Sequence, residues 1–301
     1  MTIRAKHSAH SKPSPASESH GSCPVPSSVK STRAVLLCAV LASPAIPFGP
    51  AFAADGEVAA SYDITLGGFA LAKGNLAVKV EKDAYTARVG YRTAGVGKVM
   101  SGARGEAKST GTLRPDRPVP ASYLLEGSGD KKDHHVTMAL AAGSVRDLDV
   151  EPPLKDDDER IPVTAAHRRD VLDPLSAILV PIARRDGAAG REVCERTLPI
   201  YDGWTRYDVK LSYKRTDAVA KPGYSGPAVV CAARWIPVSG HKPDRAGTRF
   251  MAENRNLEMA LAPVGDSGLM VPVRIAVETM SGLLVVQADR FQVIAGSHAA
   301  R

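Results

Sequence analysis

Apolar and polar residues alternate along most of the chain beyond residue 54. Between residues 85 and 92, and again between 206 and 213, every odd position is aromatic or aliphatic and every even one is small or polar. A period of two predicts strands that bury one face and expose the other, as in antiparallel sheets. Further strands are predicted at 58–66, 69–81, 101–113, 119–128, 134–142, 227–237, 256–264, 271–279 and 283–293.

Pairs of turn-forming residues separate several of these strands. They are Gly67-Gly68, Lys82-Asp83 and Ser281-Gly282, and such pairs favour tight hairpin turns. A dozen short strands joined by turns predict a mainly β fold, either an antiparallel curved sheet or an open barrel.

One short helix is predicted between Asp173 and Pro181. Asp173 can accept hydrogen bonds from free backbone N–H groups as the N-cap, and Pro174 suits the first helical position. Its apolar stripe consists of Leu175, Ile178 and Leu179. We expect this helix on the concave face of the sheet, facing the apolar residues of 85–91 and 207–211. If the protein binds a ligand, the helix should leave a cavity open at one end.

The first 53 residues have the organisation of a signal peptide. Lys30 and Arg33 precede an apolar run at 34–42, and the small–x–small pattern of residues 51–53 places cleavage after Ala53. The run is shorter than the roughly 20 residues needed to span a bilayer. The Ser-, His- and Pro-rich stretch before it predicts disorder. We therefore expect a periplasmic protein without a transmembrane span in the mature chain.

The mature chain, 54–301, is predicted to form a single β-rich domain. A Pro-rich, charged segment at 151–170, with the acidic run 156–159, predicts a solvated loop within it. An ordinary calcium loop would need interleaved ligands and a glycine turn that are missing here.

Charge and aromatic content argue against nucleic-acid binding. The formal net charge is +7, but residues 1–53 carry five Lys or Arg and one Glu. Beyond residue 53 there remain 34 basic and 31 acidic residues. Aromatic residues make up 5% of the sequence, too few to favour stacking platforms for bases. We expect no nucleic-acid partner.

A serine-protease pattern is present but is judged coincidental. His167, Asp208 and Ser267 occur in the His, Asp, Ser order of chymotrypsin-like enzymes, and Ser267 lies in Gly-Asp-Ser-Gly. The mechanism needs a buried Asp that orients the His. Asp208 instead occupies the polar face of its predicted strand, and the Gly-Pro expected after Gly-Asp-Ser-Gly is Leu269-Met270. We therefore predict no catalytic residues and no enzyme activity.

Other motifs also favour structural interpretations. His134 and His135 are adjacent, so they point to opposite faces of a strand and cannot bind one ion together. Gly95-Val96-Gly97 lacks the third glycine of a dinucleotide fingerprint and suggests a flexible loop. We predict no metal and no cofactor. Trp204 and Trp235 fit core packing better than a pocket.

Cys194 and Cys231 are the two cysteines beyond the leader. In an oxidising compartment such a pair usually forms a disulfide. If Cys194 began a flat three-stranded meander, it would lie about 9.6 Å from Cys231, whereas a disulfide needs Cα atoms within about 7 Å. Either the bond is absent, or Cys194 precedes its strand where the chain crosses over the sheet.

The mature chain resembles the domain-of-unknown-function 3108 family of exported bacterial proteins over roughly 58–293. The resemblance is carried by 173–176, Cys194, 197–203, 206–208, 224–231, Pro237, 240–241 and 272–275. It implies an exported, β-rich, barrel-like fold, similar to the lipoprotein-carrier half-barrels of the Gram-negative periplasm. It implies no established activity, and the stretch 242–256 matches no signature of the family.

Three functional classes remain open. The first is a binding or carrier module for a lipid or another amphiphilic envelope molecule, with ligand-binding residues that the sequence does not reveal. The second is a scaffold or accessory protein that acts on an envelope protein partner, and the third is an enzyme of unrecognised type. A deep apolar pocket would favour the first, and a filled barrel with an exposed apolar patch the second.

Overall fold

Strands make up most of the residues that the computed structural model describes, which are 55–129, 133–155, 157–182 and 190–295. These residues lie within one structural unit, Gly49–Arg301. The predicted signal peptide, 1–53, and Asp156 of the acidic run lie outside the described residues.

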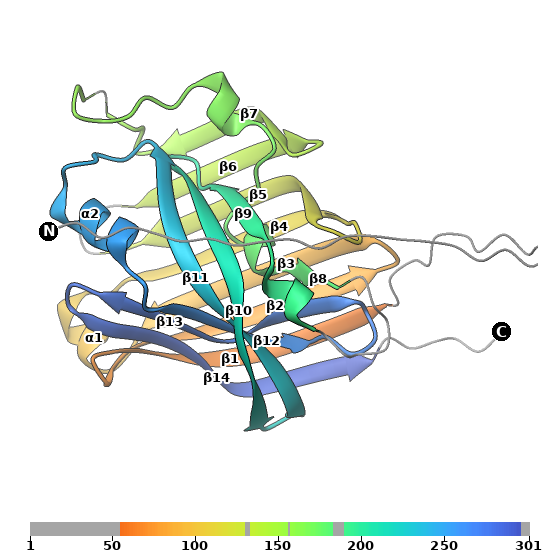
Figure 1. Cartoon of the computed structure of the whole chain (residues 1–301). Coiled ribbons are helices and arrows are strands. Elements are labelled where there is room, and N and C mark those ends of the chain that lie inside the picture. Colours follow the sequence, from red (N-terminus) through yellow and green to blue (C-terminus); the bar gives the residue numbers. More distant parts are fainter. Residues whose placement is uncertain (1–54, 130–132, 156, 183–189, 296–301) are drawn as a thin grey trace, which may run out of the picture. The chain divides into compact units, whose positions relative to one another are not determined.

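The described residues form fourteen strands and a few short helices (Figure 1). The strands are β1 (Gly56–Leu66), β2 (Phe69–Glu81), β3 (Ala84–Thr93), β4 (Arg104–Leu113), β5 (Pro118–Ser128), β6 (His134–Ala141), β7 (Ser144–Glu151), β8 (Val180–Pro181), β9 (Thr197–Tyr201), β10 (Arg206–Lys221), β11 (Tyr224–Ser239), β12 (Leu257–Pro263), β13 (Leu269–Thr279) and β14 (Gly282–Ala295). The α-helices are α1 (Val96–Met100) and α2 (Ala246–Glu253), and the 3-10 turns are η1 (Ala165–Arg168), η2 (Ser176–Ile178) and η3 (Arg191–Cys194). In this part of the chain neither α-helix is long and apolar enough to cross a membrane.

All the strands belong to one sheet whose neighbours run antiparallel. The order is β7-β6-β5-β4-β3-β2-β1-β14-β13-β12-β11-β10-β9, with β8 paired to β13. Two meanders therefore meet where β1 pairs with β14. The predicted fold class, a mainly β antiparallel curved sheet, is confirmed. The predicted turns Gly67-Gly68 and Lys82-Asp83 join β1 to β2 and β2 to β3, and the turn between β13 and β14 is Met280-Ser281, one residue before the predicted pair.

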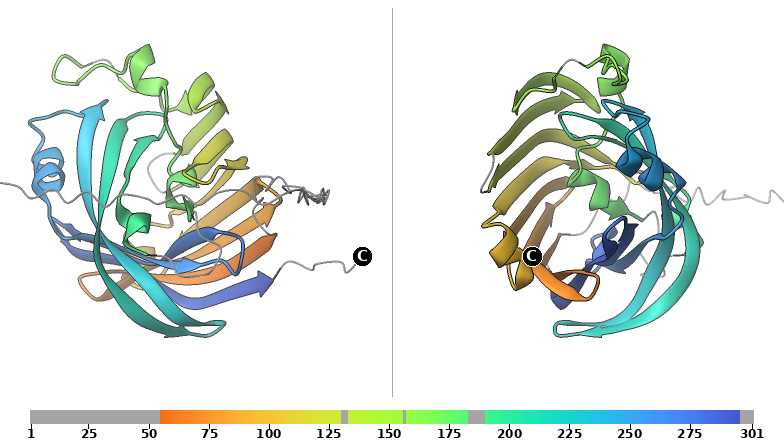
Figure 2. Two further views of the ribbon diagram at one scale, coloured as in Figure 1. Left: turned by 45° about the vertical axis from the view of Figure 1, so that its right-hand side comes forward. Right: turned by 90° about the vertical axis from the view of Figure 1, so that its left-hand side faces the viewer.

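The sheet curves so that its second half lies across its first. The long hairpin β10–β11 crosses in front of β1–β6 (Figures 1 and 2). At the tip of this hairpin the Phe291 N–H of β14 donates to the carbonyl of Pro222, and Tyr224 contacts the Phe291 ring. The two halves therefore enclose an interior, as in orthogonally packed sheets.

A segment that we call the inner segment, residues 171–182, runs through this interior (Figure 2). Backbone hydrogen bonds that attach it to other segments run from the Val171 N–H to the Gly143 carbonyl, from the Leu172 N–H to the Pro199 carbonyl and from the Ile182 N–H to the Gly268 carbonyl. The predicted helix here is a single 3-10 turn, η2, and not an α-helix. The chain becomes extended at Leu179 and pairs with β13 through β8, so strand pairing ends the helix after one turn.

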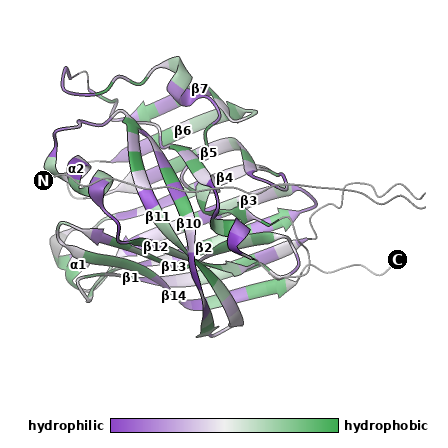
Figure 3. Ribbon diagram, viewed as in Figure 1, coloured by the Kyte–Doolittle hydropathy of each residue, from purple (hydrophilic) through white to green (hydrophobic). Residues whose placement is uncertain are grey.

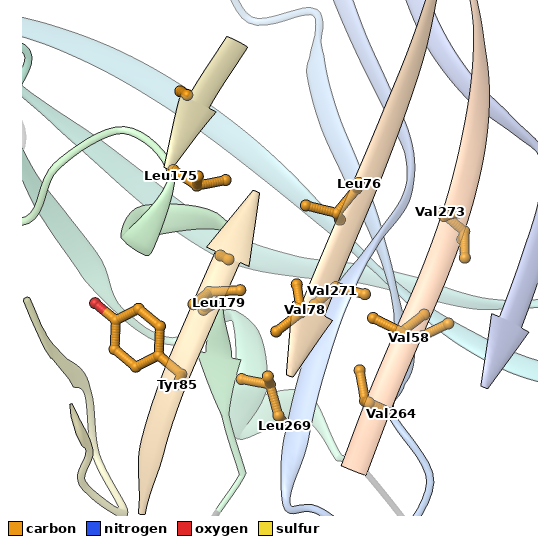
Figure 4. Packing of buried hydrophobic residues seen from close by; sticks show 14 of the residues in the cluster. Val58, Leu76, Val78, Tyr85, Leu175, Leu179, Val264, Leu269, Val271 and Val273 are labelled. Carbon is orange, nitrogen blue, oxygen red and sulfur yellow. The ribbon is translucent and has the colours of Figure 1, made fainter. Parts of the chain in front are cut away.

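The inner segment joins two apolar clusters. Val171, Leu175 and Leu179 belong to the first cluster, together with the inward-facing side chains of β1–β6. Figure 4 shows Leu179 between the side chains of Tyr85 and Val78. The second cluster contains Leu172, Ala177 and Val180, with Tyr207 and Val209 packed against it. The two alternating stretches predicted to face this segment therefore do pack on its clusters.

Three strands of the second half are buried on both faces. Residues 228–231, 259–262 and 269–273 are unbroken runs of buried residues, and alternate positions within 228–231 belong to different clusters. Uninterrupted apolar runs are typical of strands covered on both sides. The strong alternation elsewhere, in β2 and β6, corresponds to strands with one exposed face.

Candidate functional site

Six residues lie side by side across β1–β6 and form what we call the glycine–aromatic row. The strand register pairs them in succession: Tyr62, Gly74, Tyr91, Gly105, Gly127 and His134. Residues paired in register point to the same face of a sheet. This is the inner face, because Tyr62 is part of the first cluster and Tyr91 alternates in phase with buried Tyr85. Three glycines in one row leave the sheet without side chains there.

The ring of Tyr91 lies on this glycine floor. A Cβ atom at Gly105 would come within 2.6 Å of Tyr91 Cε1, and one at Gly127 would lie 3.9 Å from the Tyr91 hydroxyl. The ring therefore extends from β3 over β4 toward β5. Tyr91 is nevertheless 42% exposed, so part of its ring is open to a ligand.

An aromatic side chain lies at each end of the row and is held there by a specific contact. The Tyr62 hydroxyl donates to the Pro272 carbonyl at 2.6 Å, and burial raises the pKa of this phenol. At the other end the His134 ring meets the Trp204 ring edge-on, with centroids 6.2 Å apart. Trp204 is fixed by its indole N–H, which donates to the Pro152 carbonyl at 2.8 Å.

A cavity of about 1020 Å³ follows the row. It is lined by the six row residues and by the residues next to them along each strand. This volume is at the upper end of the range of about 300–1,000 Å³ for small-molecule sites. Lys73, Arg92 and Arg104 lie on one side of the row and Glu106 and Glu126 on the other. Because each is next to a row residue along its strand, its side chain points to the opposite, outer face of the sheet.

The opposite end of the same strands is filled by the inner segment. There Asp173 is fully buried, and its Oδ1 accepts hydrogen bonds from the N–H groups of Leu175 and Ser176 at 3.0 and 2.9 Å. Its Oδ2 accepts from the hydroxyls of Ser176 and of Ser109 on β4. Burial raises the pKa of Asp173, and the hydrogen bonds from Ser176 and Ser109 partly offset this. The predicted capping role of Asp173 is thus observed, in a network that also anchors the segment to the sheet.

Tyr85 extends this network to β3. Its hydroxyl lies 2.6 Å from Ser176 Oγ, and burial raises its pKa. Gly111 opposite Tyr85 must be small, since a Cβ there would lie 2.3 Å from the Val119 carbonyl oxygen and 2.7 Å from the Tyr85 hydroxyl. The interior is therefore packed at the Tyr85 end and hollow at the Tyr91 end.

The residues of the serine-protease pattern are held in separate local contacts. The buried Ser267 hydroxyl donates to the Val264 carbonyl at 2.6 Å. His167 Nδ1 accepts the Thr164 N–H at 3.1 Å within the η1 turn. Asp208 pairs with Arg206 at 2.7 Å. A triad would need the His to bond both to the Asp and to the Ser, and these partners differ.

The histidine and tryptophan candidates are placed as follows. His134 belongs to the row, while His135 points away and lies 2.9 Å from Thr137 Oγ1. Within the described residues no group of three or more His, Cys, Asp or Glu is arranged to hold a metal ion. Trp235 packs against Tyr207 and against the edge of His241.

Cys194 and Cys231 lie at disulfide distance, with Cα atoms 5.4 Å apart. Cys194 ends the η3 turn before β9, and Cys231 lies on β11. The geometry corresponds to the alternative in which Cys194 precedes its strand. Both cysteines belong to the second cluster and are fully buried.

The Gly95-Val96-Gly97 stretch is not a flexible loop. It begins α1, and the Ala94 N–H donates to the Leu71 carbonyl at 2.9 Å just before it. A Cβ at Gly97 would overlap the same carbonyl oxygen, at 2.0 Å. The glycines therefore serve close packing of α1 on β2, which the sequence motif alone did not reveal.

The chain is a barrel-like β protein, in which one curved antiparallel sheet encloses the inner segment. The profile of the family described as "Protein of unknown function (DUF3108)" matches residues 61–289. The chain belongs to that family. Among curated proteins no match was found. A crystal structure titled as a beta-barrel-like protein of domain of unknown function DUF1849 from Brucella abortus is similar, with 9% identity and a TM-score of 0.45. The similarity covers 79% of this chain and 98% of that one.

Proposed function

We propose that the protein is an exported, non-enzymatic binding module that holds the apolar part of an amphiphilic envelope molecule along the glycine–aromatic row. The observation that carries this proposal is the contrast between the two ends of the inner face. One end is sealed by the inner segment, and the other is a cavity of about 1020 Å³ on a floor of three glycines.

The chemistry of the cavity suits an amphiphile. At Gly74 and Gly127 the floor lets an acyl chain or a flat ring approach the backbone closely. The exposed Tyr91 ring, which covers Gly105, offers an apolar surface beside them. The Tyr91 hydroxyl and the His134 ring are the polar side-chain groups that the row offers to a headgroup.

Export to the periplasm is part of the proposal. The order of basic, apolar and small residues in 1–53 supports it. The Cys194–Cys231 pair supports it independently, because disulfides persist in oxidising compartments.

Binding can be tested with 11-(dansylamino)undecanoic acid, a fluorescent amphiphile with an apolar chain and a carboxylate. We expect saturable fluorescence enhancement with the wild-type protein. Gly127→Val should weaken it about tenfold or more, because the added side chain occupies the floor that an apolar chain of the probe would use. A Cβ at Gly127 meets no atom closer than 3.9 Å, so this variant should fold with an unchanged or higher melting temperature.

The matched control is Ala139→Val, which enlarges an exposed position of β6 outside the cavity. It should bind the probe like the wild type. Equal affinity in the wild type and Gly127→Val would refute the site, and absence of binding in all three proteins would favour the scaffold class instead.

A further inference from the structure

Five exposed apolar side chains gather at one end of the sheet, and we call them the tip patch. They are Phe69, Val96, Val99, Met280 and Leu283, of which Phe69, Met280 and Val99 are 67%, 64% and 90% exposed. They come from the β1–β2 turn, from α1 and from the β13–β14 turn. Figure 1 shows α1 beside these turns, and Figure 3 shows the hydropathy of the same region.

Backbone contacts hold the three parts of the tip patch together. The Gly67 N–H donates to the Leu283 carbonyl at 2.9 Å, which joins the two turns. The Ala94 N–H donates to the Leu71 carbonyl at 2.9 Å, which fixes the start of α1 beside β2. The exposed apolar side chains are thus presented by an ordered surface.

A row of cations lies next to the tip patch. Lys73, Arg92 and Arg104 are paired in register across β2, β3 and β4, so they point to the same face, which is the outer one. Lys73 pairs with Asp63, whereas Arg92 and Arg104 form no ion pair within the described residues. Exposed Lys98 lies in α1 between Val96 and Val99. The acidic Glu106 and Glu126 lie two positions further from the tips.

We propose that the tip patch and this cation row dock the protein on an anionic phospholipid surface. Exposed apolar side chains at hairpin tips can enter the headgroup region, and basic residues near them are attracted by anionic lipids. The cations lie near the same end of the sheet as the tips, and a positive charge there complements an anionic bilayer. A docked molecule would place the Tyr91 end of the cavity next to the membrane and the sealed end away from it.

Vesicle flotation tests this proposal. The purified protein should float with phosphatidylcholine vesicles that contain phosphatidylglycerol, and bind far less to phosphatidylcholine alone or at high salt. Phe69→Ser/Val99→Ser should lower the partition coefficient about tenfold or more, and Arg92→Glu/Arg104→Glu should do the same. All four positions are exposed, so the variants should keep the wild-type melting temperature. Ile236→Ser on β11, also an exposed apolar residue, is the control and should float like the wild type.

Three results would overturn the proposal. The first is absence of flotation, and the second is flotation that Phe69→Ser/Val99→Ser leaves unchanged. The third is a concentration-dependent dimer that this double variant abolishes, without vesicle binding, since the tip patch would then cover a second copy. The fluorescent-amphiphile assay is independent of all three, so docking and ligand binding can fail separately.

Discussion

Replacing Asp173 with alanine should release the inner segment from the sheet. The carboxylate accepts four hydrogen bonds, two from the backbone N–H groups of Leu175 and Ser176 and two from the hydroxyls of Ser109 and Ser176. Asp173 is fully buried, so water cannot replace these bonds. Each buried N–H left without an acceptor costs about 1–3 kcal/mol.

The expected loss is smaller than the sum of four bonds. The Ser109 and Ser176 hydroxyls lie 2.8 Å apart, so they can turn to each other when the carboxylate is absent. The two backbone N–H groups have no such alternative. We therefore expect Asp173→Ala to lower the free energy of unfolding by about 3–5 kcal/mol, which is a large share of a typical total of about 5–15 kcal/mol.

Asp173→Asn separates hydrogen bonding from charge. Its carbonyl oxygen can accept the two backbone N–H bonds, and its amide can donate to the two hydroxyls. Burial raises the pKa of Asp173, so the neutral amide also avoids the cost of a buried charge. We expect Asp173→Asn to stay within about 1 kcal/mol of the wild type at neutral pH.

Urea unfolding followed by far-UV circular dichroism and by Trp204 and Trp235 fluorescence measures these differences. Asp244→Ala is the control, because that carboxylate is fully exposed and has only a 3.8 Å contact with Arg249. A loss below about 1 kcal/mol in Asp173→Ala would refute the anchoring role. Equal losses in the Ala and Asn variants would show that the charge, and not hydrogen-bond acceptance, is what the network needs.

Three further predictions concern pH, the cysteines and the serine. Burial raises the folded-state pKa of Asp173 above its ordinary 3.8. The free energy of unfolding of the wild type relative to Asp173→Asn should therefore be greatest in acid and fall as the pH rises through that raised pKa. A difference between the two proteins that does not change with pH in urea titrations would contradict this. Cys194→Ser should cost roughly 3–4 kcal/mol for a crosslink across a sequence separation of 37, with no further loss on adding Cys231→Ser. Two titratable thiols in the unfolded, unreduced mature protein, which lacks Cys23 and Cys38, would show that no bond forms. A fluorophosphonate probe should not label the buried Ser267, and labelling that is lost in Ser267→Ala would revive the protease interpretation.

Much of the strand pattern was predictable because alternation and turn chemistry are local. The stretch 69–81 was predicted with the bounds that β2 has, and the turns Gly67-Gly68 and Lys82-Asp83 were identified from their own residues. The turn predicted at Ser281-Gly282 lies one residue earlier, at Met280-Ser281. The strands β7, β8 and β9 were missed. The strand β7 follows β6 directly after a short turn, and β9 is only five residues long.

The glycine–aromatic row could not be predicted from the sequence. Gly74, Gly105 and Gly127 lie in three different strands, and each is only an isolated glycine in its own pattern. They become one floor when the register pairs β2 through β6. Register between strands depends on long-range packing, and a shift of one residue would move the glycines to the other face.

The sequence predicted the position of the inner segment and the capping role of Asp173, but not the conformation of the segment. Asp173 caps the backbone as expected, because an N-cap needs only its two or three following residues. The helix ended early because Val180 and Pro181 pair with β13. That partner lies about ninety positions further along the chain, beyond the reach of local propensity.

Native mass spectrometry of the protein isolated from its own cell envelope tests the central claim most directly. Wild-type protein and Gly127→Val should be prepared in parallel, with equal melting temperatures as the criterion of folding. We predict a wild-type species carrying a non-covalent adduct of the mass of an envelope amphiphile, which collisional activation releases, and a marked loss of that species in Gly127→Val. A bare wild-type mass, or the same adduct in equal amount on both proteins, would contradict binding along the glycine–aromatic row.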